Sequence, residues 1–126
     1  PYPNGIAFSA DGAWVYLAAT RANAVWRLMR KAPESGKPMV GLYVQLSGGL
    51  GPDGLTVAPT GELAVVHGQA GQVWIFDQLG QPLVRVRTPS GLWTTAARFG
   101  GDDGRTLFIV EAQSGSVLAY ELANKS

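Results

Sequence analysis

Short runs of alternating apolar and polar residues recur along the chain, separated by turns that carry glycine. Runs such as WVYLAAT, LAVVHG and TLFIVEA are rich in aromatic and β-branched residues, and QVWIFD and SVLAYEL follow the alternating pattern. A two-residue period with this composition is typical of β-strands. The segment RANAVWRLMRK could also line one face of a helix, but its position in the repeat described next favours a strand. The pattern therefore predicts an all-β protein.

The predicted strands group into three similar units. Each unit opens with a signal before a short apolar strand: PNG with Asn4, PDG with Asp53, and TTA with Thr94 and Thr95. A glycine turn, a longer strand, a polar loop and an alternating strand follow, and the first two units add a fourth strand, MVGLYVQLS and PLVRVRTP. The signals are roughly 40–50 residues apart, the length of a propeller blade of antiparallel strands. We therefore predict blades at about residues 3–47, 52–89 and 93–122, the third without its outer strand.

Three blades are too few to close a ring, because propellers have about 4–8 blades. We therefore expect one half-propeller domain over residues 1–126. A second copy in a homodimer, or a missing N-terminal half, would complete a six-bladed ring. The unpaired edge of the third blade supports this expectation, because such edges pair with other chains. The alternative fold is a β-sandwich of about eleven strands, which needs no partner.

Composition narrows the function classes. Hydrophobic residues make up 46% and charged residues 15%, as expected for a soluble globular domain. The net charge of +1 gives no electrostatic footprint for nucleic acid, and no apolar run reaches the roughly 18 residues of a membrane helix. With no cysteine and one histidine, the chain has no zinc-thiolate site, cysteine nucleophile or histidine-rich metal cluster, and it carries no indication of its compartment. Phosphate-binding loops and nucleophile elbows are also absent.

Asn4 and Asp53 are the candidate ligands of a metal ion. The innermost strand of a blade lines the channel, so residues that precede these strands converge on one rim. Their amide and carboxylate oxygens suit Ca²⁺ or Mg²⁺ and are tolerable for Zn²⁺. The competing interpretation is that both residues stabilise ordinary turns, as Asn and Asp often do before glycine.

Other polar residues are expected near the same rim. His67 ends the second strand of the second unit and could bind substrate, although a surface or supporting role is the favoured interpretation. Thr94 and Thr95 could face the channel. Glu111 and Gln113 could supply oxygen ligands, but we expect them to be solvated.

The stretches PNGIAFSADGAWVYLAAT, GPDGLTVAPTGELAVVHGQAGQVWIFD and TTAARFGGDDGRTLFIVEA resemble the C-terminal half of the gluconolactonase/senescence-marker-protein-30 family of six-bladed propellers. The resemblance implies that Asn4 and Asp53 bind a divalent cation on the central axis, with Ca²⁺ as the first candidate and Mg²⁺ or Zn²⁺ as alternatives. It also implies that Asp53 is the general base for hydrolysis of a small lactone or ester. A further glutamate ligand near the family's N-terminus has no counterpart in this chain.

Two functions follow from these observations. The first is a metal-dependent, lactonase-like hydrolase that needs a second half or a second copy to complete its site. The alternative is a non-enzymatic propeller module that binds a partner on its rim, which the missing glutamate favours.

Overall fold

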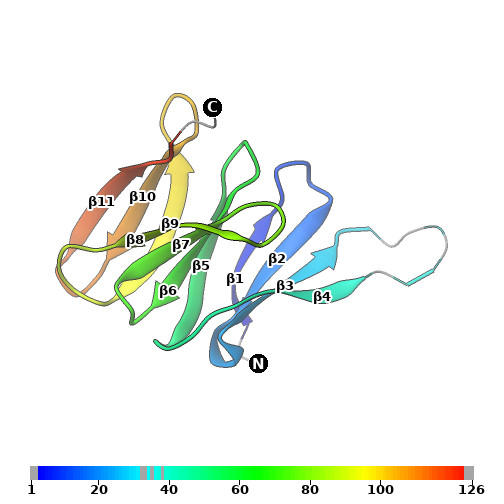
Figure 1. Cartoon of the computed structure of the whole chain (residues 1–126), viewed down its shortest axis with the longest axis horizontal. Coiled ribbons are helices and arrows are strands. Elements are labelled where there is room, and N and C mark those ends of the chain that lie inside the picture. The colour runs from blue at the N-terminus through cyan, green and yellow to red at the C-terminus, as the bar shows by residue number, and fades with distance from the viewer. Residues whose placement is uncertain (1–2, 32–33, 35, 38, 124–126) are drawn as a thin grey trace.

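The computed structural model describes residues 3–31, 34, 36–37 and 39–123. These residues form three antiparallel sheets that stand side by side (Figure 1). The strand orders are β1-β2-β3-β4, β5-β6-β7-β8 and β9-β10-β11, so within each sheet every strand pairs with its neighbours in sequence. The strand bounds are β1 Pro3–Phe8, β2 Trp14–Ala19, β3 Ala24–Met29, β4 Val40–Gln45, β5 Gly51–Val57, β6 Leu63–Gly68, β7 Gln72–Phe76, β8 Pro82–Arg87, β9 Thr94–Gly100, β10 Thr106–Glu111 and β11 Ser116–Glu121, with a 3₁₀ turn at Thr20–Ala22 between β2 and β3.

The all-β prediction is confirmed, and the arrangement is that of a propeller fragment. The central part of the ambiguous segment forms strand β3, in which each residue from Ala24 to Met29 pairs with β2. A β-sandwich has two sheets, so the three sheets observed here make that alternative wrong. Within the described part of the chain, no helix has the length and apolar character needed to cross a membrane.

The middle sheet is covered on both faces, and strand β6 is buried along its whole length. Successive side chains of a strand point to opposite faces. Leu63 and Val65 accordingly enter the core between the first two sheets, whereas Ala64 and Val66 enter the core between the second and third. One strand therefore supplies two cores, which is why its sequence is continuously apolar.

Among the residues that the structure describes, none covers the outer face of the first sheet or that of the third. Ile6, Leu17, Trp26 and Leu42 pair in a row across the four strands of the first sheet. Ile6 is 63% exposed and Leu42 is 52% exposed. On the third sheet the exposed hydrophobic residues are Phe108, Val110 and Val117. Both open faces therefore carry the apolar pattern that the middle sheet buries.

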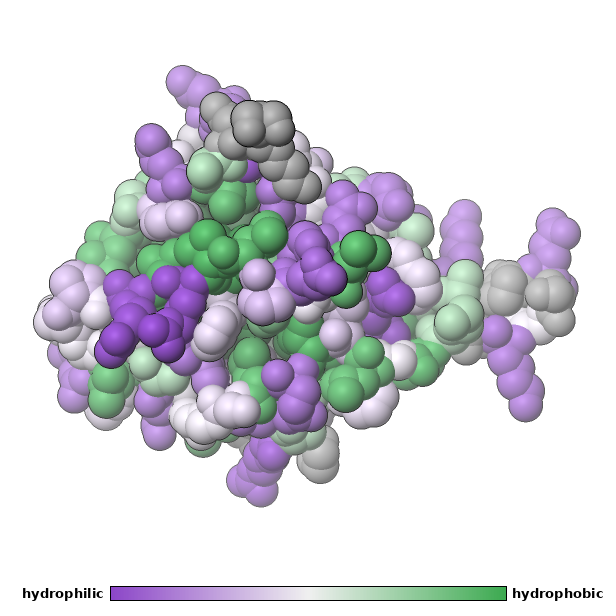
Figure 2. All heavy atoms as spheres, viewed as in Figure 1, coloured by the Kyte–Doolittle hydropathy of each residue, from purple (hydrophilic) through white to green (hydrophobic). Residues whose placement is uncertain are grey.

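The described residues between β3 and β4 include Lys31, Glu34 and Lys37, which are hydrophilic and exposed (Figure 2). In Figure 1 they lie to the side of the three sheets. These residues therefore take no part in either core.

Glycine allows the innermost strands β1 and β5 to approach closely. A Cβ atom added at Gly5 would lie 2.1 Å from the carbonyl oxygen of Asp53. One added at Gly54 would lie 3.1 Å from the carbonyl oxygen of Thr95 in β9. Neither glycine has a left-handed backbone, so the requirement is for space. Asn4 and Asp53 themselves lie within strands β1 and β5, so the interpretation that they stabilise ordinary turns is wrong.

Candidate functional site

Each innermost strand carries a β-bulge at the same level of the structure. The pairing shifts between Pro3 and Ile6 in β1 and between Pro52 and Leu55 in β5. In β9 it shifts between the residues paired with Glu111 and Val110, which leaves Thr95 as the extra residue. Bulges re-aim side chains and are frequent beside active sites. Thr95, and not Thr94, therefore corresponds to the Asn4 and Asp53 positions.

Asn4 and Asp53 come together where β1 and β5 begin. Asn4 is exposed and Asp53 is half-buried. Burial raises the pKa of the Asp53 carboxyl above its ordinary value, while a hydrogen bond from the Asn4 side chain opposes this shift. The Asn4 amide nitrogen also lies 3.4 Å from the Thr20 hydroxyl, to which it donates. The Asn4 amide nitrogen thus faces both Thr20 and Asp53, so a carboxylate and a side-chain amide lie side by side here.

The side-chain oxygen atoms of Asn4 and Asp53 are of the kind that a hard cation binds. Ca²⁺ is bound by about six to eight oxygen atoms from carboxylates, amides, carbonyls and water. Among the residues that the structure describes, no group of three or more His, Cys, Asp or Glu side chains could hold a metal ion. Asn4 and Asp53 therefore fit as part of a coordination shell whose other oxygens would come from water or from further protein.

Asp53 faces a cavity of about 250 Å³. Gly68 and Gln69 from the end of β6, and Thr95 from β9, form part of its wall. Leu50 and Trp93 complete the wall, together with Thr94. Asp53 is the one charged side chain among these lining residues, so the cavity sets a carboxylate against a largely apolar surface.

His67 is buried and all its polar atoms have partners. Its Nδ1 lies 3.0 Å from Gln72 Nε2 and 3.3 Å from Trp74 Nε1. Because an indole nitrogen can only donate, Nδ1 is the acceptor and the ring proton lies on Nε2. This Nε2 donates to the carbonyl of Gly48 at 2.8 Å. The geometry corresponds to the supporting role, since the ring holds the loop before β5 and presents no free nitrogen to the cavity.

Glu111 is fully buried, so the expectation that it is solvated is wrong. Its Oε2 accepts the backbone N–H groups of Trp93 at 2.8 Å and Gln113 at 3.0 Å. Its Oε1 accepts the backbone N–H and the hydroxyl of Ser114. Burial raises the pKa of Glu111, but these hydrogen bonds outweigh it and lower the pKa to about 2. Glu111 thus anchors loops, and the exposed Gln113 accepts from Leu92 N–H.

Buried threonine hydroxyls join neighbouring sheets below the site. The Thr94 hydroxyl donates to the His67 carbonyl at 2.7 Å, which links the third sheet to the second. The Thr20 hydroxyl donates to the Pro52 carbonyl at 2.8 Å, which links the first sheet to the second. Thr94 is 1% exposed, and its hydroxyl is occupied by the hydrogen bond to His67. Thr95, in contrast, is exposed at the cavity.

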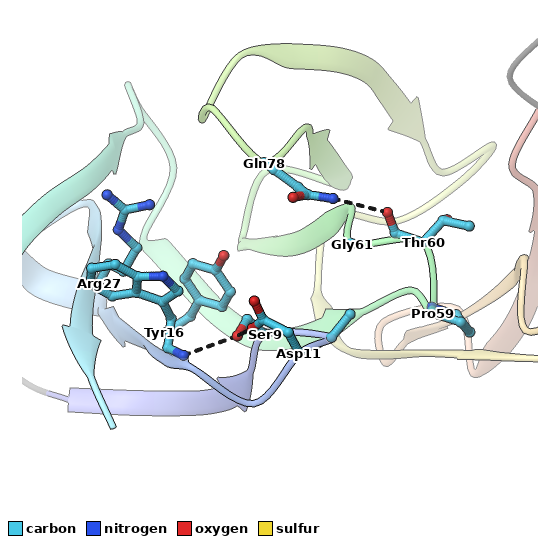
Figure 3. Close-up of a pocket in the computed structure, with 10 residues that line it drawn as sticks. Ser9, Asp11, Tyr16, Arg27, Pro59, Thr60, Gly61 and Gln78 are labelled. Carbon is cyan, nitrogen blue, oxygen red and sulfur yellow. Dashed lines mark hydrogen bonds between the residues drawn. The ribbon is translucent and has the colours of Figure 1, made fainter. Parts of the chain in front are cut away.

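A second cavity of about 180 Å³ lies at the hairpin-turn end of the sheets, between the β1–β2 and β5–β6 turns (Figure 3). Hydrogen bonds from the Ser9 hydroxyl and the Ala13 N–H lower the pKa of Asp11 and tie its carboxylate into its own turn. The Arg27 guanidinium stacks 4.2 Å from the centre of the Trp14 ring. Asp11 is therefore bonded within its own turn, and Arg27 is stacked on Trp14. The Asp53 cavity is the better candidate site.

The sequence interpretation missed Leu50 and Trp93 as cavity residues. Each is a large apolar residue in a connecting loop, three positions before Asp53 and two positions before Thr95. They are 52% and 51% exposed. One sequence pattern could have identified them: a large apolar residue stands just before the second and the third signal, in a loop that is otherwise small or polar.

Comparison with known sequences places this site in context. Residues 1–113 match the family described as SMP-30/Gluconolactonase/LRE-like region. A 6-deoxy-6-sulfogluconolactonase from Pseudomonas putida is 33% identical over 125 aligned residues, which cover 96% of this chain and 41% of that protein. The chain thus spans about two fifths of the length of this curated relative.

The chain is also similar to solved structures of related proteins. The calcium-binding protein regucalcin from Agrobacterium tumefaciens superposes with a TM-score of 0.71 at 30% identity, covering 86% of this chain and 37% of that one. A gluconolactonase from Xanthomonas campestris superposes with a TM-score of 0.72 at 27% identity, covering 93% of this chain and 36% of that one.

Proposed function

Because the chain belongs to the SMP-30/gluconolactonase/LRE-like family, we propose that it forms part of a metal-dependent hydrolase that opens a small lactone or ester. The observation that carries this proposal is the meeting of Asn4 and Asp53 beside the cavity of about 250 Å³. The names of the relatives, a sulfogluconolactonase and a gluconolactonase, support a lactone as the substrate class.

Asp53 is proposed as both cation ligand and general base, and Asn4 as a second ligand through its amide oxygen. One carboxylate oxygen of Asp53 would hold the cation, and the other would accept the proton of the attacking water. Water adds to the lactone carbonyl carbon, and the bond from this carbon to the ring oxygen breaks. The proton held by Asp53 returns to the ring oxygen, so the product is a hydroxy acid.

Ca²⁺ is our first candidate for the cation, with Mg²⁺ or Zn²⁺ as alternatives. The calcium-binding relative supports this order, as do the hard oxygen donors. When bound, a divalent cation polarises a carbonyl oxygen and lowers the pKa of coordinated water.

We further propose that the two open sheet faces pack against additional blades. Apolar patches larger than a few hundred Å² are rare on monomers, and hydrophobic residues are exposed on both faces, among them Ile6 and Leu42 on the first sheet and Phe108 and Val117 on the third. A homodimer would supply three more blades around a two-fold axis. A longer chain with an N-terminal half would serve the same purpose. In a homodimer, two copies of Asn4 and Asp53 would share the axis and enlarge the set of oxygen donors.

Light scattering tests the homodimer directly. We expect a particle of twice the 13.3 kDa chain mass at micromolar concentration. A stable, folded monomer would refute the homodimer, and the longer chain would then be the arrangement to test.

A lactone panel assayed with added Ca²⁺, Mg²⁺ or Zn²⁺ tests the function. Asp53→Asn is expected to abolish turnover and weaken metal binding in calorimetric titration, with little change in the free energy of unfolding. Thr95→Val, at the corresponding position in the third sheet, is the matched control and should retain metal binding. Folded protein without turnover of any lactone would overturn hydrolase activity of this chain, alone or as a homodimer, and favour the alternative of a binding module.

A further inference from the structure

We propose that Leu50 and Trp93 form an apolar wall that selects lactones with an apolar substituent, which would lie against the second and third sheets. This inference rests on the proposed lactonase function and names its substrate class. Both side chains line the Asp53 cavity. About half of the surface of each is exposed, so a ligand beside Asp53 could cover it.

The position of Leu50 is set by hydrogen bonds on both sides of it. Its own N–H donates to the Gly68 carbonyl at 2.8 Å. Two residues earlier, the carbonyl of Gly48 accepts from His67 Nε2 at 2.8 Å and from the Asn23 amide at 3.0 Å. The buried His67 ring therefore acts as a positioning group, and the loop backbone that carries Leu50 is fixed before a ligand binds.

The position of Trp93 is set in a similar way by a buried carboxylate. Glu111 accepts the Trp93 N–H, and the Trp93 carbonyl accepts the N–H of Ala112 at 2.8 Å. A Cβ atom at Gly91 would collide with the Glu111 carboxylate, so the loop lies directly on this anchor. A backbone held in place before binding lowers the conformational entropy that is lost when a ligand covers the side chain.

The remaining lining residues offer little to a polyhydroxylated ligand. The Thr94 hydroxyl already donates to His67, and Gly68 contributes no side chain. Gln69, Thr95 and the Trp93 indole N–H are the neutral side-chain groups in the cavity lining that could bond a hydroxyl group. A substrate with several hydroxyl groups against this wall would leave most of them without partners, which costs binding free energy. An alkyl substituent would instead remove apolar surface of Leu50 and Trp93 from water.

The test compares γ-nonalactone, which carries an alkyl tail, with D-glucono-δ-lactone. Binding to the whole chain is measured by calorimetry, and hydrolysis is followed separately. We expect γ-nonalactone to bind more tightly, and Trp93→Ala and Leu50→Ala each to weaken its binding by roughly tenfold while changing D-glucono-δ-lactone binding by less than about twofold. Leu92→Ala is the matched control, since Leu92 is 56% exposed beside Trp93 but does not line the cavity.

Each other outcome counts against the proposal. Equal losses for the two lactones in Trp93→Ala would mean that the indole stacks on the lactone ring and does not select the substituent. Tighter binding of D-glucono-δ-lactone, or no binding of γ-nonalactone, would overturn the apolar wall. Binding of γ-nonalactone with the expected selectivity but without hydrolysis would refute lactonase activity of this chain, alone or as a homodimer, and leave the selectivity of the wall supported. Circular dichroism of both variants ensures that a loss of binding is not a loss of fold.

Discussion

Replacing Gly5 by alanine tests whether the close approach of β1 and β5 builds the site. The added Cβ would lie 2.1 Å from the Asp53 carbonyl oxygen and 3.2 Å from its carbonyl carbon. An ordinary carbon–oxygen contact is about 3.3 Å, so the two strands would have to separate by roughly 1 Å. Backbone atoms, not a flexible side chain, block the methyl group, and the strain therefore falls on the contact between the first two sheets.

The expected loss of stability follows from two opposing effects. Overpacking a close contact costs about 1–3 kcal/mol. Alanine also restricts the unfolded chain relative to glycine, which stabilises the fold by about 0.4–1 kcal/mol where space allows. We expect Gly5→Ala to lower the free energy of unfolding by about 2 kcal/mol. Gly54→Ala should cost less, about 1 kcal/mol, because its nearest neighbour is 3.1 Å away.

Urea denaturation of the variants measures these differences. Gly41→Ala in β4 is the control, because no atom lies within 4 Å of its added Cβ and its backbone is not left-handed. This control should be neutral or slightly stabilising. If Gly5→Ala matched Gly41→Ala in stability, the close approach of β1 and β5, and with it the geometry that joins Asn4 to Asp53, would be refuted.

The remaining predictions concern buried polar groups near the site and at the turns between strands. Because the pKa of Glu111 in the folded protein is about 2 against an ordinary 4.5, its ionised form stabilises the fold above about pH 4.5, and this contribution is lost as pH falls towards 2. Glu111→Gln should therefore flatten the pH dependence of the urea midpoint in this window, and an unchanged profile would contradict the assignment. Thr94→Val should cost about 1 kcal/mol, whereas Thr95→Val should stay within about 0.5 kcal/mol; equal values in urea denaturation would argue against the buried Thr94 link. Arg105→Met should cost about 3 kcal/mol, because the buried Glu62 carboxylate would lose the guanidinium 3.6 Å away; a thermal midpoint like that of the unchanged chain would exclude a stabilising role.

Local pattern was sufficient to predict the strands and their grouping. Alternation, glycine turns and the repeated PNG and PDG signals depend only on neighbours in sequence. The short connections between consecutive strands in turn favour their pairing within one sheet. The two-residue period also assigns the faces of β6, since it places Leu63 and Ala64 on opposite sides. The repeat itself brought Asn4 and Asp53 to equivalent positions.

The roles of individual polar residues were decided only by the tertiary structure. Nothing near Glu111 in sequence shows that its carboxylate would lie beneath the loop at Gly91 and Trp93, because these contacts cross about twenty residues of chain. His67 depends on Gly48 from another loop and Trp74 from the next strand in the same way. Burial and partner choice arise when distant segments pack together.

The sequence by itself determined an all-β chain of three repeated sheets with an Asn and an Asp at matching positions. Tertiary structure decided that these signals lie in bulged strands, that Thr95 rather than Thr94 matches them, and that Leu50 and Trp93 enclose Asp53. The physical reason is the range of the forces involved. Strand formation follows from side-chain alternation within a few residues, whereas a cavity and its hydrogen bonds exist only after three sheets have come together.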